Sequence, residues 1–142
     1  MKNFITAIIL IVLFTKCEYL IPDKWYDLIY LSNESDIPIS YFVADSFVGN
    51  GSIYPDTILP EELPYLTYPL VKSNEKQVIV NQDHKIENYF KFPADTLSVF
   101  IFHTDTLNKY SWEEVRDGYM ILKRYDLSLD DLEVNNYTII YP

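Results

Sequence analysis

Residues 96–104, with the sequence TLSVFIFHT, limit the fold of this chain more than any other stretch. Apolar side chains stand at Leu97 and at four consecutive positions from 99 to 102, so they do not alternate with polar ones. Consecutive side chains of a strand point to opposite faces, and a strand that is apolar on both faces has to be covered on both. We therefore expect this strand to form the centre of the core.

Shorter segments rich in Tyr, Phe, Ile and Val surround this strand in the sequence, and these residues favour a half-buried sheet. Alternation in the segment 37–44 places four apolar side chains on one face: Ile37, Ile39, Tyr41 and Val43. The polar turn SNESD joins this segment to 26–31, which predicts a β-hairpin. Further strands are predicted at 68–73, 76–81, 119–125 and 137–141, and 85–92 fits either a strand or an irregular segment.

Two short helices are predicted near the C-terminus from their capping residues. Ser111 precedes Glu114 by three positions, and Ser128 precedes Asp131 by three, which is the spacing of an N-terminal cap. Gly118 follows the first helix and can end it. Each helix is therefore expected to have no more than two turns.

Close strand spacing, short helices and turn-rich joints favour a mainly β fold. We predict one domain over residues 26–142, a single antiparallel β-sandwich with two or three short helices near the C-terminus. An immunoglobulin-like arrangement fits this pattern, and an α+β fold is the alternative. The stretch 45–67 holds two of the three glycines and three prolines, so it is expected to be a long loop and a candidate binding surface.

The N-terminus has the pattern of an export signal. Lys2 precedes an uncharged, mostly apolar run that ends at Phe14, and this run is shorter than the roughly 20 residues that span a bilayer. We predict that residues 1–16 are a lipoprotein signal peptide and that 17–25 form a tether. Cys17, the only cysteine, stands at the cleavage position and has no partner for an intrachain disulfide.

The stretch LFTKC, residues 13–17, resembles the lipobox of bacterial lipoproteins, in which the cysteine is lipidated. Its departures, Phe14 and Lys16, resemble the relaxed lipoboxes of Bacteroidota. This resemblance implies that Cys17 carries the lipid, and acyl chains contribute about 0.8 kcal/mol of membrane binding per buried CH₂. A secreted protein with a stray cysteine, or an uncleaved anchor, is the alternative. The ending 97–142 is similar to that of small uncharacterised lipoproteins from gut Bacteroidales, which implies a cell-envelope lipoprotein and indicates no activity.

Charge limits the partners of the chain. The net charge is −10, and it becomes −12 when residues 1–16, which contain Lys2 and Lys16, are removed. Such a field repels phosphate backbones and anionic lipid, so no nucleic-acid partner is expected. The membrane link is expected to be covalent, through lipid on Cys17, at the outer membrane or the cell surface. A periplasmic or secreted location is the alternative.

Catalytic chemistry has weak support in the sequence. A nucleophile needs a neighbouring base, and only His84 and His103 could serve. His103 ends the buried strand and is expected to be structural, whereas His84 lies in a polar turn and is expected to be solvated. Neither metal-ligand spacing nor a phosphate-binding loop occurs, so no metal or cofactor is expected. A small envelope hydrolase with paired carboxylates is the least favoured alternative.

Three Asp-Thr-aliphatic triplets recur, and each resembles the acceptor motif for O-glycosylation of exported Bacteroidota proteins. The acceptor hydroxyls belong to Thr57, Thr96 and Thr106. Ordinary turn and capping chemistry is the alternative explanation for Asp-Thr pairs. N-glycosylation sequons at Asn33, Asn50 and Asn136 would matter only in a secreted eukaryotic protein.

These features predict a cell-envelope lipoprotein that acts as a non-catalytic binding or structural module, with a protein or a glycan as its partner. An assembly component of a surface structure and an accessory of glycan uptake are the alternatives. The chain contains 13 Tyr, 8 Phe and 2 Trp, most of which are expected in the core. A binding module predicts exposed aromatic side chains on one sheet face or in 45–67, and an assembly component predicts a pairable sheet edge.

Overall fold

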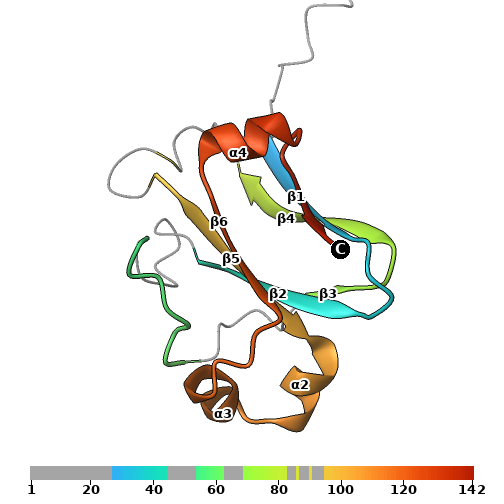
Figure 1. Cartoon of the computed structure of the whole chain (residues 1–142), viewed down its shortest axis with the longest axis vertical. Coiled ribbons are helices and arrows are strands. Elements are labelled where there is room, and N and C mark those ends of the chain that lie inside the picture. Colours follow the sequence, from blue (N-terminus) through green and yellow to red (C-terminus); the bar gives the residue numbers. More distant parts are fainter. Residues whose placement is uncertain (1–26, 45–53, 63–68, 83–85, 87–89, 91–94) are drawn as a thin grey trace, which may run out of the picture.

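The computed structural model describes residues 27–44, 54–62, 69–82, 86, 90 and 95–142. The predicted signal peptide, the tether and Cys17 lie outside these residues. Within them, the chain forms two sheets packed together, with three short helices near the C-terminus (Figure 1). The prediction of a mainly β fold with short C-terminal helices is therefore confirmed.

Seven strands of the described residues are divided between the two sheets. The three-stranded sheet has the order β4-β1-β7, formed by Glu75–Gln82, Asp27–Asn33 and Thr138–Tyr141. The four-stranded sheet has the order β3-β2-β5-β6, formed by Leu70–Val71, Ile39–Ala44, Leu97–His103 and Lys123–Leu127. Buried apolar side chains from both sheets belong to one core cluster, so the sheets share an apolar interior.

The predicted hairpin between the first two strands is wrong, because β1 and β2 belong to different sheets. β1 pairs with β4, and β2 pairs with β3, so the chain bends from one sheet to the other twice at the same place. Figure 1 shows both bends side by side, where β1 leads into β2 and β3 leads into β4. The side chain of Asn33 joins them, since its amide donates to the carbonyl of Ile37 in one bend and of Lys72 in the other. We call this junction the corner.

The prediction that all strand pairs are antiparallel is also wrong for one pair. β7 runs parallel to β1, with Tyr30 opposite Thr138 and Asn33 opposite Tyr141. α4 (Leu129–Val134) leads from β6 in one sheet to β7 in the other, so β7 does not return beside the strand before it. β7 pairs instead with β1, the first described strand, and strands that are not joined by a tight turn can pair in parallel.

β5 is covered on both faces, as its sequence predicts. Leu97, Val99 and Ile101 lie in the cluster between the sheets. Phe100 and Phe102 are also fully buried, but they belong to a second cluster that includes residues of a helix. The expected apolar face of 37–44 is confirmed by the same cluster, because residues 39 and 41 of β2 are buried between the sheets, and residue 43 of β2 and residue 37 just before it pack against them.

Three two-turn helices follow β5. α2 is Thr104–Lys109 and α3 is Trp112–Asp117, and both lie below the four-stranded sheet in Figure 1, whereas α4 lies above β6 and β7. Both predicted capping boxes are present, at Ser111 and at Ser128, each with reciprocal bonds to the acidic residue three positions later. α2 was not predicted as a separate helix, and its N-cap is the His103 side chain.

Gly118 ends α3 as predicted, but it keeps a helical φ of −78°. The left-handed conformation falls on the next residue, Tyr119, with a φ of 47°. Met120 N donates to Val115 O and Tyr119 N to Arg116 O, which are the two bonds of a Schellman ending. A tyrosine therefore occupies a position that usually belongs to glycine.

Removing a capping hydroxyl is expected to destabilise the domain in a pH-dependent way. Hydrogen bonds from Ser111 hold the pKa of the Glu114 carboxyl below its usual value, and Ser128 does the same for Asp131. A lowered folded-state pKa stabilises the fold above the ordinary range of the carboxyl, and this stabilisation is lost as the pH falls through the lowered pKa. Ser128→Ala should therefore lower Tm by about 3 °C at neutral pH.

Measuring Tm of Ser128→Ala and of the native chain in acid as well as at neutral pH tests this prediction. The difference in Tm between Ser128→Ala and the native chain should shrink as Asp131 becomes protonated, in thermal unfolding followed by circular dichroism. Glu133→Gln, an exposed acid of the same helix, is the control and should leave Tm unchanged. A difference that stays constant from neutral pH to strong acid would contradict the assignment of the cap.

Candidate binding pocket

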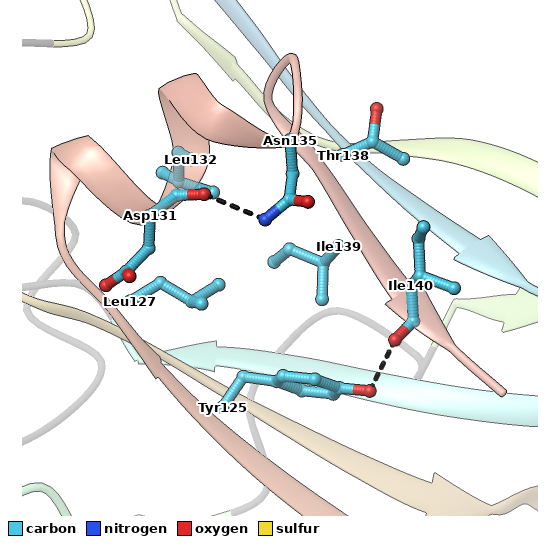
Figure 2. Close-up of a pocket in the computed structure, with 8 residues that line it drawn as sticks. All are labelled: Tyr125, Leu127, Asp131, Leu132, Asn135, Thr138, Ile139 and Ile140. Carbon is cyan, nitrogen blue, oxygen red and sulfur yellow. Dashed lines mark hydrogen bonds between the residues drawn. The ribbon is translucent and has the colours of Figure 1, made fainter.

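The two sheets are joined at one side and separate at the other. On the joined side, β3 and β4 are linked through the corner. On the opposite side, β6 ends the four-stranded sheet and β7 ends the three-stranded sheet, and α4 connects them. An open pocket of about 170 Å³ lies between these two edge strands and the helix (Figure 2). We call it the seam pocket. Its lining residues are Tyr125, Leu127, Asp131, Leu132, Asn135, Thr138, Ile139 and Ile140.

The ring of Tyr125 lies across one side of the seam pocket, which we call the floor, opposite α4 (Figure 2). Its hydroxyl donates to the carbonyl oxygen of Ile140 at 2.6 Å, so the bond connects β6 directly to β7. Burial raises the pKa of Tyr125 to about 12, and the neighbouring Tyr141 adds to the rise. The phenol is therefore neutral at physiological pH, and its one proton is engaged within the protein.

Aliphatic side chains form the walls of the seam pocket. Leu127 comes from β6, Leu132 from α4 and Ile139 from β7, and the last two are buried. Ile140 also lines the pocket and is 45 % exposed. A group that enters the pocket thus meets apolar surface from three elements, and this surface favours an apolar group or an apolar ring face.

Two polar side chains of α4 and its C-terminal end stand at the rim. The Asp131 carboxylate accepts from the backbone and hydroxyl of Ser128 through Oδ2 alone. The Asn135 amide donates to the backbone carbonyl of Asp131 at 3.0 Å through Nδ2. Asp131 Oδ1 and Asn135 Oδ1 accept no hydrogen bond from the described residues. The rim therefore offers two acceptor oxygens, while one of the two N–H donors of Asn135 is in use.

The hydroxyl of Thr138 adds no free donor to this rim. Thr138 Oγ1 donates to the carbonyl of Asn136 and accepts from Lys76 Nζ at 3.1 Å. The same ammonium lies 4.4 Å from the centroid of the Tyr30 ring, so Lys76 is held against the three-stranded sheet. The polar groups beside the pocket are thus positioned by interactions within the domain.

The residues that the sequence singled out do not line the seam pocket. Thr57 is 3 % exposed, so its modification in the folded chain would require the segment around it to detach. Thr96 is half-buried beside Asp95, to whose carboxylate its hydroxyl donates, and Thr106 is half-buried in α2. Their glycosylation stays a prediction, as does the lipidation of Cys17, which lies outside the described residues.

His103 has the structural role that its position predicts. Its Nδ1 accepts from the backbone N–H of Asp105 at 3.1 Å and so caps α2. His84 lies outside the described residues. No cluster of three or more His, Cys, Asp or Glu suited to a metal occurs in the described part of the chain. The helices among the described residues are all too short or too polar to cross a membrane.

The described part of the predicted loop, residues 54–62, covers the second core cluster. Leu59 is buried in that cluster, and the carbonyl of Pro60 accepts from the indole N–H of Trp112. The carbonyl of Thr57 accepts from Arg124 of β6. Ile58 is 63 % exposed and Tyr54 is 37 % exposed, so this segment presents some apolar surface. Its described contacts fasten it to the fold.

The chain was compared with protein families, with curated proteins and with solved structures. No protein-family model, curated protein or solved structure matches it. The described residues define a mainly β domain of two packed sheets, with a mixed apolar and polar pocket at the open side of the sheets.

Proposed function

We propose that this chain is a lipid-anchored protein of the cell envelope whose domain is a non-catalytic binding module. The seam pocket is its binding site. The observation that carries this proposal is the combination of an aromatic floor, aliphatic walls and two acceptor oxygens at the rim. Pockets that bind small molecules combine mostly apolar walls with a few polar groups in this way.

A pair of tryptophan substitutions tests the binding site. Ile140→Trp places a large ring on a residue that lines the pocket, whereas Val134→Trp places one on an 81 %-exposed position of α4 that does not line it. Saturation-transfer NMR on the full chain in detergent would use a panel of neutral oligosaccharides, acidic oligosaccharides and short peptides. At least one probe should bind the native chain and Val134→Trp but not Ile140→Trp. Binding that Ile140→Trp leaves unchanged would contradict the proposed site.

Lipid attachment at Cys17 anchors the proposed module to the outer membrane or the cell surface, and release into the periplasm or medium is the alternative. Cells fed a palmitate analogue should label the native chain, and Cys17→Ala should lose essentially all of the label, because the thiol is the attachment atom. Equal labelling of the two proteins would refute the anchor. Lys16→Ala, which restores a small residue before the cysteine, should label at least as strongly as the native chain.

A component of an assembled surface structure is the second candidate function, and β4 supports it. β4 has eight residues and ends its sheet, and no other described strand pairs with its outer side. Its register with β1 shifts between Ile29 and Tyr30, which leaves Ile79 without an opposite residue. Such bulges protect edges from pairing, so we place binding first. A photo-cross-linker at Asn81 that captures another strand-bearing envelope protein, with Glu133 as the control position, would favour assembly.

An immunoglobulin constant-type domain also has seven strands divided into four and three, but in the orders 1-2-5-4 and 3-6-7. The orders here are 3-2-5-6 and 4-1-7. We therefore propose a β-sandwich whose strands change sheets at the corner, a device known from sheets that pack at a large angle.

A further inference from the structure

The size of the seam pocket limits its occupant to one small group. Its volume of about 170 Å³ is below the roughly 300–1,000 Å³ of pockets that enclose drug-sized ligands. The Tyr125 ring gives it a flat side, and Ile139 stands across the pocket from this ring in Figure 2. A flat ring-shaped group with one apolar face matches this shape better than a long flexible chain.

Hydrogen bonding at the rim selects a ligand that donates. The hydroxyl protons of Tyr125 and Thr138 and one of the two N–H protons of Asn135 Nδ2 are engaged with backbone carbonyls, so a single amide N–H is the donor that remains among these groups. Asp131 Oδ1 and Asn135 Oδ1 accept nothing from the described residues, so water bonds to them until a ligand replaces it. Hydroxyl groups on the edge of a ring would satisfy both oxygens.

Charge at the pocket favours a neutral ligand. Asp131 is ionised at neutral pH and the chain as a whole carries −10, which disfavours carboxylates and phosphates, and the ammonium of Lys76 beside the pocket is already held by Thr138 and the Tyr30 ring. The aromatic floor would attract a cation, but Lys123 Nζ already lies 4.6 Å from the centroid of the Tyr125 ring. A second cation at this ring would meet the repulsion of the first.

The outer edge of β7 disfavours an added peptide strand. The carbonyl of Tyr137 accepts from the N–H of Tyr30 in β1, and the carbonyl of Tyr141 accepts from the N–H of Glu34, the residue that follows β1. The backbone groups of Thr138 and Ile140 therefore face away from β1. Thr138 N already donates to Asn135 O, and Ile140 O already accepts from Tyr125. A peptide that extended the sheet here would have to displace both bonds.

We propose that the seam pocket binds one neutral pyranose residue of a glycan, stacked on Tyr125, with its hydroxyls donating to Asp131 Oδ1 and Asn135 Oδ1. The apolar C–H face of the sugar covers the ring of Tyr125, Ile139 lies on the opposite side of the pocket, and the hydroxyl edge of the sugar lies at the rim. This inference rests on the proposed binding function and names the ligand class of the same site.

The test uses the full chain in detergent and three sets of probes: neutral oligosaccharides of glucose, mannose, galactose and N-acetylglucosamine, polygalacturonate fragments, and uncharged hexapeptides. Binding is measured by saturation-transfer NMR and titration calorimetry. At least one neutral sugar should bind, and the acidic fragments should bind at least tenfold more weakly. Stronger saturation transfer to the C–H protons of one sugar face than to the other protons is the expected NMR signature of stacking.

Two matched pairs of variants locate the contacts. Tyr125→Phe keeps the ring and should bind the sugar within about threefold of the native chain, whereas Tyr125→Leu removes the ring and should lose at least tenfold. Asn135→Ala should lose about fivefold to tenfold, and Asn108→Ala, an exposed asparagine of α2, should lose nothing. Unchanged circular dichroism and Tm within a few degrees confirm that each variant is folded.

The outcomes separate this inference from the function on which it rests. Sugar binding that Ile140→Trp abolishes supports both. Binding of a peptide or an acidic fragment that Ile140→Trp abolishes, without any neutral sugar, overturns the sugar inference and keeps the binding module. Sugar binding that Tyr125→Leu and Ile140→Trp leave unchanged overturns the assignment to this pocket, and binding of no probe at all overturns both.

Discussion

Replacing Asn33 by alanine is expected to lower the free energy of unfolding by about 3–5 kcal/mol, a large part of the stability of a domain of this size. The side chain is 1 % exposed at the corner. Its Nδ2 lies 2.8 Å from the carbonyl of Ile37, 3.2 Å from that of Val71 and 3.0 Å from that of Lys72. Its Oδ1 accepts from the backbone and hydroxyl of Ser35. Alanine would remove all of these bonds in a place that water does not easily reach, although the carbonyls of Ile37 and Lys72 would each keep a second partner, the Ser35 hydroxyl and the Glu75 N–H respectively.

Asn33→Asp separates the role of the amide donor from that of side-chain volume. The aspartate keeps the acceptor for Ser35, but it sets a carboxylate oxygen against the three carbonyl oxygens in place of an N–H donor. At neutral pH it should therefore destabilise at least as much as alanine. Part of the loss should be recovered in acid, because a protonated carboxyl can donate again.

Urea unfolding followed by tyrosine and tryptophan fluorescence measures both variants of Asn33. Asn81→Asp is the matched control, because Asn81 is exposed on β4, and it should change the free energy of unfolding by less than about 0.5 kcal/mol. If Asn33→Asp stayed within about 1 kcal/mol of the native chain at neutral pH, the corner would not depend on this amide.

Features that depend on neighbouring residues could be predicted from the sequence. A capping box depends only on the cap residue and on the residue three positions later, so the caps at Ser111 and Ser128 could be predicted from the sequence alone. The burial of β5 follows from its own consecutive apolar residues, whatever covers it. Each of these predictions is a statement about one segment and its own side chains.

Features that join distant segments could not be predicted in the same way. A polar turn has the same composition whether the next strand returns beside the first or enters another sheet, and Asn33 finds its partner Val71 38 residues away. The strand predicted at 119–125 begins only at Lys123, because Met120 and Ile121 bury their side chains in the second cluster without strand pairing.

The seam pocket could not be predicted from the sequence, because it also joins distant segments. Tyr125 and Ile140 meet because α4 carries the chain from one sheet to the other. Asp131 was recognised only as a capping residue, since one of its oxygens performs that role. Nothing local indicates that its second oxygen faces a pocket, and only the pairing of β7 with β1 brings the walls together.

Replacing Phe100 by alanine is the second substitution with a large expected effect, a loss of about 3–5 kcal/mol in the free energy of unfolding. Phe100 is fully buried on the face of β5 that the helices and residues 54–62 cover. Its ring lies 6.0 Å from that of Phe42, and the guanidinium carbon of Arg124 lies 5.2 Å from its centroid. Alanine removes these contacts and leaves a cavity that the sheet, which is held in register on both sides of β5, cannot close.

The contact between the Arg124 guanidinium and the Phe100 ring can be tested separately from the volume of the ring. Arg124 also bonds to Asp126 and to the carbonyl of Thr57, so it fastens the segment 54–62 over Phe100. Phe100→Leu keeps most of the volume but not the aromatic face, and it should lower the free energy of unfolding by about 1–2 kcal/mol.

In a double-mutant cycle, Phe100→Leu and Arg124→Met should show a coupling of about 0.5–1 kcal/mol. Tyr110→Ala, at a 37 %-exposed ring, is the control and should change stability by less than about 1 kcal/mol. If the losses for Phe100→Leu and Arg124→Met were additive, Arg124 would hold residues 54–62 through its hydrogen bonds alone. If Phe100→Ala lost no more stability than Tyr110→Ala, the second cluster would lie outside the cooperative core.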